Sequence, residues 1–269
     1  IPMATAIKLG INAVSDIFTE KVVEISPSSN QVVWEWRSIE HIVQDVYPSI
    51  STYGSLNQNP QLININYNNE SDGDYMHANG IEYDEIKDVL FISVNYFSEV
   101  WVIDHSTSTA QASSHLGGNY NKGGDLIYRF GNPETYNNIG QRLFYNNHFP
   151  NLINEGLPGA NNMLVFNNGS NINQSTVYEF ALPTVFNLKP NTNNEPIVVW
   201  SFTDNNLFNG RISGAVRLKN GNTLIAEGDY GFWEVTNNKQ IAWKYKDTSD
   251  FWRCYGYAKN SPEIMSLDL

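Results

Sequence analysis

The sequence holds one cysteine, Cys254, only five histidines and no long apolar run. A single cysteine cannot form an intrachain disulfide, which excludes a fold stapled by such bridges. No stretch reaches the ~18 apolar residues of a membrane-spanning helix, so we expect no membrane span. Basic residues are also scarce, with 16 Lys and Arg against 28 Asp and Glu and a net charge of −12. Without a concentrated basic patch, we expect no nucleic-acid partner.

Sustained helical periodicity is missing as well, apart from a short helix predicted near residues 38–45. Pairs of strands rich in β-branched and aromatic residues recur instead. The pairs are residues 22–25 with 32–36, 100–104 with 126–130, 177–180 with 197–202, and 232–235 with 241–245. Two more strands precede most pairs, as at 79–83 with 88–94 and at 213–218 with 222–226.

These strands form units of four antiparallel strands that repeat at roughly 55 to 75 residues, a spacing typical of propeller blades with loop insertions. The pattern predicts an all-β fold, a β-propeller of four-stranded antiparallel blades, with about three complete units and a partial one at each end. We predict one propeller domain over residues 1–269 that starts in mid-blade, at a second strand. Since closed propellers normally have four or more blades, we expect N-terminal blades outside this chain, or an unusual closure.

Histidine and arginine recur near the start of the innermost strands. His77 and Arg211 each precede such a strand, His148 lies in a polar loop before another unit, and His41 follows the strand at 32–36. Innermost strands surround a propeller's axis, so these four side chains are expected at one mouth of the channel, as a cationic site for an anion. A zinc site made of the three histidines is an alternative.

The other two histidines flank a Ser/Thr-rich insertion. We expect both His105 and His115 to be exposed loop residues.

Several phrases follow one another in a fixed order along nearly the whole chain. They are VWEW (33–36) with EHIVQD (40–45), DYMHAN (74–79), SEVWVIDHST (98–107), GGDLIYRFGNP (123–133), RLF (142–144) before His148, LPGANN (157–162) with FNNG (166–169), and SGA (213–215) with NGNTL (220–224). Together these phrases resemble the bacterial-type arylsulfotransferases, or aryl-sulfate sulfotransferases, a family of β-propeller enzymes.

The resemblance implies a six-bladed propeller that moves a sulfuryl group from an aryl sulfate to a phenol without PAPS, the nucleotide sulfate donor, and without a cofactor. It implies a ping-pong mechanism through a sulfated histidine. By position, His148 resembles that nucleophile, His77 the histidine that assists at the sulfuryl oxygens or leaving group, and His41 a third active-site histidine. Aromatic side chains expected along the substrate are Tyr75, Tyr96, Phe97, Tyr145, Phe149 and Phe208.

One position departs from the family. Asn95 stands where the family has an arginine that would hold the sulfate oxygens, and a charge-assisted hydrogen bond contributes roughly 1.5–3 kcal/mol. Arg129 or Arg211 is a substitute, and with Asn95 and Ser213 they form the predicted substrate-binding set. We predict no metal in this site.

Two other functions fit the sequence. A non-catalytic extracellular propeller, acting as a binding or structural module, is favoured by Asn95 and by the small number of blades. A hydrolase of sulfate or phosphate esters would share the first half-reaction. A homo-oligomer is compatible with either function.

We expect a secreted or periplasmic location. The segment that starts at Ile1 has neither the charged nor the apolar region of a signal peptide. Sequons at Asn69, Asn168 and Asn173 permit secretion without requiring it.

Overall fold

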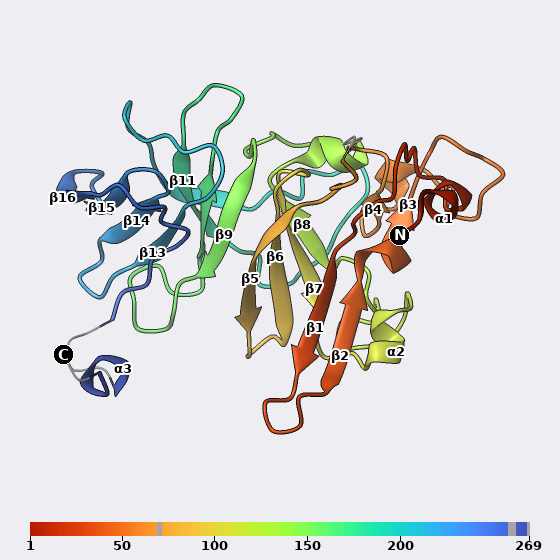
Figure 1. Cartoon of the computed structure of the whole chain (residues 1–269), viewed down its shortest axis with the longest axis horizontal. Helices are drawn as coiled ribbons and strands as arrows, with labels where there is room; N and C mark the ends of the chain where they lie inside the picture. Colours follow the sequence, from red (N-terminus) through yellow and green to blue (C-terminus); the bar gives the residue numbers. More distant parts are fainter. Residues whose placement is uncertain (69–71, 258–261, 268–269) are drawn as a thin grey trace. The chain divides into compact units, whose positions relative to one another are not determined.

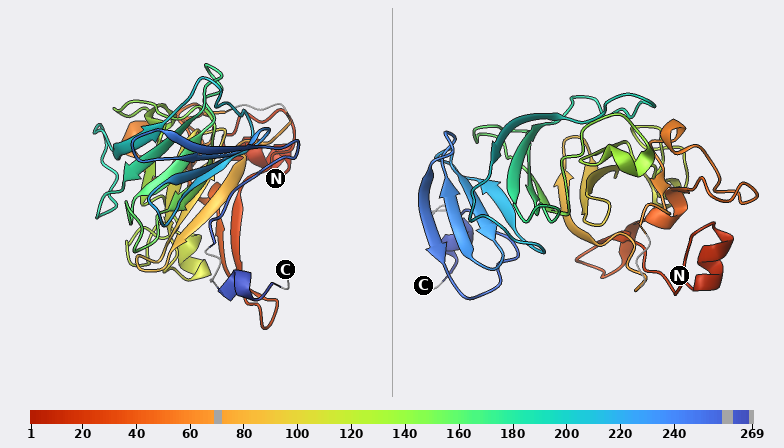
Figure 2. Two further views of the ribbon diagram at one scale, coloured as in Figure 1. Left: turned by 90° about the vertical axis from the view of Figure 1, so that its left-hand side faces the viewer. Right: turned by 90° about the horizontal axis from the view of Figure 1, so that it is seen from above.

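The computed structural model describes residues 1–68, 72–257 and 262–267, so the sequon at Asn69 lies outside the described residues. The structure is all-β, with 9% helix and 32% strand. It contains three four-stranded antiparallel sheets, each built from four strands that are consecutive in the chain. Figure 1 labels most of these strands, and the right-hand view of Figure 2 shows those of the last sheet side by side. The blade-like unit predicted from the sequence is therefore confirmed.

The element bounds are as follows. The first sheet has β5 (Ala78–Asp84), β6 (Val89–Val94), β7 (Glu99–Asp104) and β8 (Tyr128–Phe130). The second has β9 (Asn147–Leu152), β10 (Met163–Asn167), β11 (Thr176–Ala181) and β12 (Ile197–Phe202), and the third β13 (Gly214–Arg217), β14 (Thr223–Glu227), β15 (Gly231–Val235) and β16 (Ile241–Lys246). A hairpin joins β1 (Lys21–Ile25) to β2 (Val32–Arg37), and β3 (Ile42–Val43) pairs in parallel with β4 (Ile63–Asn64). The helices are α1 (Met3–Lys8), α2 (Thr109–Ala112), α3 (Pro262–Met265) and the 3-10 turns η1 (Ser38–His41), η2 (Leu56–Gln58) and η3 (Pro133–Tyr136).

The chain divides into two compact units. One comprises residues 1–147 with 183–196, and the other comprises residues 148–182 with 197–269. The long connection between β11 and β12 therefore belongs to the first unit. There, the Phe186 ring packs against Phe91 and Tyr128, and the Tyr128 hydroxyl donates to the Asn194 carbonyl.

Burial follows each strand's place in its sheet. All residues of β6 and β7, the two middle strands of the first sheet, are buried, which explains their continuous apolar runs. The outer strands β2 and β12 expose half of their residues, and the outer strand β16 exposes five of its six. An outer strand has a neighbour on only one side, so solvent reaches its free edge and outward face.

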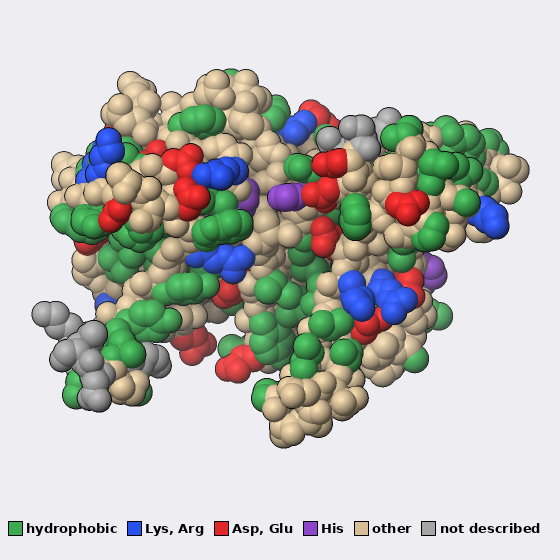
Figure 3. Space-filling model, in the orientation of Figure 1, with side chains coloured by type: hydrophobic (Ala, Val, Ile, Leu, Met, Phe, Trp, Pro, Cys, Tyr) green, Lys and Arg blue, Asp and Glu red, His purple; other side chains and the backbone are tan. Residues whose placement is uncertain are grey.

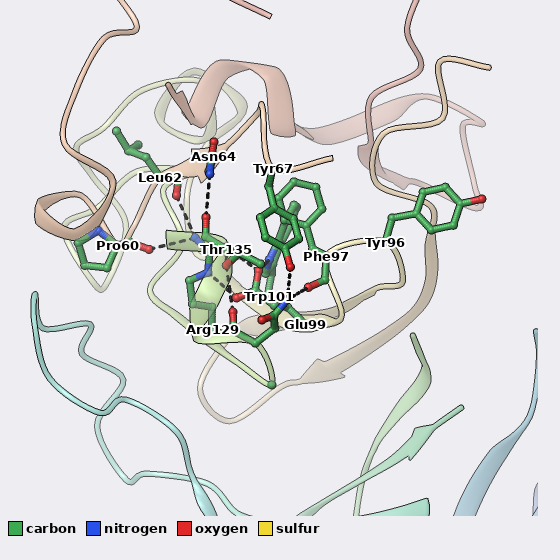
Figure 4. A network of polar contacts seen from close by, with 12 residues as sticks. Pro60, Leu62, Asn64, Tyr67, Tyr96, Phe97, Glu99, Trp101, Arg129 and Thr135 are labelled. Atoms are coloured by element: carbon green, nitrogen blue, oxygen red, sulfur yellow. Dashed lines mark hydrogen bonds and ion pairs between the residues drawn. The ribbon is translucent and has the colours of Figure 1, made fainter. Parts of the chain in front are cut away.

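The first unit is held by a buried charged network around Arg129 (Figure 4). Its guanidinium binds Glu99 through two hydrogen bonds of 2.8 and 2.5 Å. Three further donors bind the Thr135 hydroxyl and the carbonyls of Pro60 and Leu62. A guanidinium has five N–H donors, so all five are satisfied within the protein. The network joins β7, β8, η3 and the segment before β4.

Local differences from the sequence-based predictions appear at both ends. The predicted helix at 38–45 is shorter, since η1 ends at His41 and β3 follows. The N-terminal partial unit is the β1–β2 hairpin, which α1 precedes. A partial unit after β16 was predicted, but the described residues there contain only α3 and no strand.

No helix among the described residues combines the length and apolarity needed to cross a bilayer. On the face shown in Figure 3, Lys and Arg side chains form small separate groups close to acidic ones. Among the ion pairs, Glu35 pairs with Lys21 at 3.2 Å and with Arg37 at 2.5 Å.

Removal of one partner from the buried Arg129–Glu99 pair should be strongly destabilising. Arg129→Met leaves the Glu99 carboxylate buried without its counter-ion, and we expect a loss of about 3–5 kcal/mol in the free energy of unfolding. Denaturant unfolding of Arg129→Met, compared with the partly exposed control Arg142→Met, measures this loss. A loss below about 1 kcal/mol for Arg129→Met would contradict it.

Stability should also depend on pH through Glu195. Burial raises the pKa of this carboxyl from 4.5 to about 8, although its hydrogen bond from the Gly131 amide opposes the shift. Between these pH values the unfolded chain is ionised while the folded carboxyl stays protonated. The contribution of Glu195 to stability therefore falls as pH rises, by up to about 1.4 kcal/mol per pH unit.

The variant Glu195→Gln should lose this component of the pH dependence. The difference in unfolding free energy between variant and wild type, followed from pH 5 to pH 8, should move in favour of the variant. A difference that stays constant over this window would show that Glu195 ionises normally in the folded protein.

Candidate active site

His148 lies inside strand β9 and is buried, whereas the sequence predicted a loop position; this prediction is corrected. The adjacent sequence Tyr-Asn-Asn reads as a turn, but backbone pairing with β10 begins at Asn147. The imidazole Nδ1 lies 2.7 Å from the side-chain oxygen Oδ1 of Asn168. Asn168 itself is fully buried just after β10.

The neighbours of Asn168 fix the tautomer of His148. The Asn168 side-chain nitrogen donates to the carbonyls of Asn209 at 2.7 Å and Ile212 at 3.0 Å. Its oxygen must therefore face His148, and an amide oxygen can only accept. Nδ1 of His148 thus carries the hydrogen, and in the neutral ring the lone pair is on Nε2. This arrangement provides an oriented nucleophile.

The predicted residues Ser213 and Arg211 belong to the same compact unit as His148. Ser213 is buried, and its hydroxyl accepts from the Gly228 amide at 3.0 Å. Arg211 is exposed and pairs with Asp229 and Asp250 at 3.0 and 3.1 Å. The hydrogen bond that Arg211 donates to Asp229 and the charge of Asp250 raise the pKa of Arg211. Two carboxylates therefore offset the charge that was expected to hold an anion.

Asn95 anchors the chain directly before His148. Its side-chain nitrogen donates to the Asn147 carbonyl at 3.2 Å, and its side-chain oxygen accepts from Asn146 at 2.7 Å. Asn79 and the Ser93 hydroxyl donate to the same Asn147 carbonyl, at 2.8 and 3.1 Å. Three residues of the first unit, Asn95, Asn79 and Ser93, thus hold the backbone that leads into β9.

His77 stands immediately before β5 with a positive φ of 52°. Its Nδ1 lies 2.5 Å from the Asp74 carboxylate, and about half of the side chain is exposed. Because a carboxylate only accepts, Nδ1 is the protonated nitrogen. Nε2 has no hydrogen-bond partner among the described residues, so it can accept or release a proton at the surface of the unit.

The surroundings of His77 come from three segments. The Tyr96 ring stacks on its imidazole with a centroid distance of 4.8 Å, and the backbone of Asn95 donates to the His77 carbonyl. Glu20 accepts a hydrogen bond of 2.8 Å from the Ala78 amide. Burial raises the pKa of the Glu20 carboxyl, with the charge of Asp74 acting in the same direction. His77 and Asn95 are therefore neighbours within the first unit.

His41 and Arg129 have no free donor for a substrate. His41 is fully buried, and its two ring nitrogens lie 2.9 Å from Asp125 and 2.8 Å from the Ala112 carbonyl. All five donors of Arg129 bind protein acceptors, as described above, so we leave Arg129 out of the proposed sulfate site.

The aromatic residues expected along a substrate lie in different environments. Tyr75, Phe97 and Phe149 are buried core residues, whereas Phe208 is exposed. Tyr145 lies under the Arg142 guanidinium, 4.1 Å from its centre, and Tyr96 stacks on His77. His105 is packed between Trp34 and Tyr83 rather than exposed, which corrects the prediction, whereas His115 is exposed as predicted.

Sequence reasoning missed the two residues that orient the histidines. Asp74 precedes His77 by three residues, a spacing that could have suggested the pair. Asn168 is 20 residues from His148, and only strand pairing brings the two together.

The chain was also compared with known proteins. No significant match was found among curated proteins. The arylsulfotransferase (ASST) family profile matches residues 3–251 of the 269. This match spans the whole of all three four-stranded sheets and every candidate residue described above. The chain therefore belongs to the arylsulfotransferase family.

Proposed function

We propose that this protein transfers a sulfuryl group from an aryl sulfate ester to a phenol, without PAPS, through a covalent sulfohistidine at His148. The observation that carries the proposal is the hydrogen bond between His148 and Asn168, whose amide orientation leaves the lone pair on Nε2. A neutral imidazole is a competent nucleophile near neutral pH.

The reaction has two balanced steps. Nε2 of His148 attacks the sulfur, a nitrogen–sulfur bond forms, and the bond from sulfur to the aryl oxygen breaks. The acceptor phenol oxygen then attacks the same sulfur, and the nitrogen–sulfur bond breaks. The departing phenoxide needs a proton and the incoming phenol must lose one, a role for which we propose the imidazole of His77 held by Asp74.

In this proposal the neutral side chains of Asn95 and Ser213, together with Arg211, replace the family arginine. The transferred group spreads negative charge over its oxygens, so donors around them stabilise the transition state. Asn95, Arg211 and Ser213 remain the proposed substrate-binding residues.

A non-catalytic propeller is the second candidate. Asn95 stands in place of the arginine, its side-chain nitrogen and oxygen both form hydrogen bonds within the protein, and Arg211 is paired with two carboxylates. These observations favour a fold that has lost anion binding. We propose a secreted or periplasmic location for either function; of the described sequon asparagines, Asn173 is exposed and Asn168 is buried.

Substitution of His148 tests the main proposal. We expect His148→Ala to abolish transfer from a chromogenic aryl sulfate to phenol, and wild type incubated with donor alone to gain the mass of one sulfuryl group on the peptide containing His148. The substitution leaves the Asn168 oxygen without its donor at a cost of about 1–3 kcal/mol, so thermal melting must accompany the assay.

The matched control is His105→Gln, which removes a packed imidazole of the first unit and should leave transfer unchanged. Folded wild type without turnover would favour the non-catalytic propeller. Product release that phenol does not accelerate would favour the hydrolase. Transfer that persists in His148→Ala would refute the nucleophile assignment.

Asp74 should matter through His77. Asp74→Asn removes the carboxylate that holds Nδ1 protonated, and we expect kcat to fall by about 10- to 100-fold. This loss is smaller than most of the roughly 10²–10⁴-fold contribution of general acid–base catalysis, because His77 itself is retained. The pH dependence of kcat should shift as well, whereas Asp72→Asn, two residues away, should change neither quantity. An unchanged pH profile in Asp74→Asn would exclude a role for the pair in proton transfer.

A further inference from the structure

The imidazole of His41 is held between two acceptors. Nε2 lies 2.8 Å from the carbonyl oxygen of Ala112, and Nδ1 lies 2.9 Å from a carboxylate oxygen of Asp125. The carbonyl can only accept, so Nε2 carries a hydrogen. In the neutral ring, the Nδ1 lone pair then faces the carboxylate. Two acceptors at this distance need a positive charge between them, supplied either by a second proton or by a metal cation.

A third side chain, that of His115, approaches the same carboxylate oxygen of Asp125. Nδ1 of His115 lies 2.7 Å from the Asp125 oxygen that His41 approaches. One ligand atom of each residue lies within 4.8 Å of the others. Two imidazoles and one carboxylate are a ligand set that zinc uses, whereas calcium and magnesium prefer oxygen ligands.

We propose that His41, Asp125 and His115 form a binding site for a zinc-type divalent cation. His41 comes from η1, His115 from the loop after α2, and Asp125 from the segment before β8. All three lie within the first compact unit. His41 is then a metal ligand rather than a third histidine of the transfer reaction. The site is independent of the function proposed above.

The residues around His41 hold the orientation of its imidazole ring in the way that is usual for metal-bound histidines. The Ala112 carbonyl binds the ring nitrogen that the metal would not use, which is the usual partner of a zinc-bound histidine. Trp36 stacks parallel to the ring with a centroid distance of 5.9 Å, and its indole donates to the Gly124 carbonyl at 2.7 Å. A Cβ at Gly124 would lie 2.4 Å from Nε2 of His41, so only glycine fits there.

The distances fit a site that opens slightly on binding. Zinc bonds of about 2.0–2.1 Å in a tetrahedral arrangement separate the ligand atoms by about 3.3 Å. The two nitrogen–oxygen distances of 2.9 and 2.7 Å are shorter, so the ligands need to move apart by roughly half an ångström.

One side of the site reaches solvent. The His115 side chain is 62% exposed and lines a cleft of about 390 Å³ together with Glu40, Tyr53 and Asn59. Zinc with three protein ligands keeps a fourth position for water, and the exposed side of His115 leaves room for it.

Metal titration tests the proposal. Protein dialysed against a chelator is titrated with Zn²⁺ by calorimetry and with Co²⁺ by visible absorption. We expect saturation at one ion per chain and the intense bands of tetrahedral Co²⁺. His115→Ala and Asp125→Asn should each weaken Zn²⁺ binding at least tenfold.

The exposed position of His115 makes its substitution compatible with folding, which circular dichroism checks. His105→Ala is the control, since this histidine pairs with Asp88 and Glu24 outside the site and should leave the affinity unchanged. Absence of saturable binding by wild type, or an affinity unaffected by His115→Ala, would overturn the site. His41 would then be a buried imidazolium that pairs with Asp125.

Discussion

The bidentate ion pair between Arg129 and Glu99 is the interaction on which the first compact unit depends. Both side chains are completely buried, and two unpaired charges at this depth would cost several kcal/mol each. The pair is tolerated because every guanidinium N–H finds an acceptor, and because the rings of Tyr136 and Trp101 lie 4.4 and 6.0 Å from its centre. These requirements fix β7, β8 and η3 relative to one another.

Neutral amides, rather than charges, position the candidate active site. Asn79 and Asn95 hold the Asn147 carbonyl directly before His148, and Asn168 orients the His148 ring. Amide groups can satisfy buried backbone groups without the cost of burying a charge. An Asn-rich sequence thereby fixes the orientation of His148 but brings little positive charge to it. The arylsulfotransferase profile matches residues 3–251, and the second candidate function rests on a loss of anion binding.

Much of the fold could be predicted from local patterns. The hairpins 22–25 with 32–36 and 232–235 with 241–245 were found because alternating β-branched and aromatic residues encode strands locally. The position of His148 was not, because its loop-like neighbours form a strand only when β10 pairs with them. The packed state of His105 was also missed, since Trp34 and Tyr83 meet it from distant strands.

By itself, the sequence determined the strand pattern, the four-stranded units and the family, because these depend on periodicity and on the order of short phrases. Only the tertiary structure decided what each polar side chain does. The sequence made Arg129 a candidate for sulfate binding, but its guanidinium binds Glu99, 30 residues away. His41 likewise contacts Asp125, which is 84 residues away. A residue's chemistry depends on which donors and acceptors surround it, and those partners are set by chain folding rather than by sequence spacing.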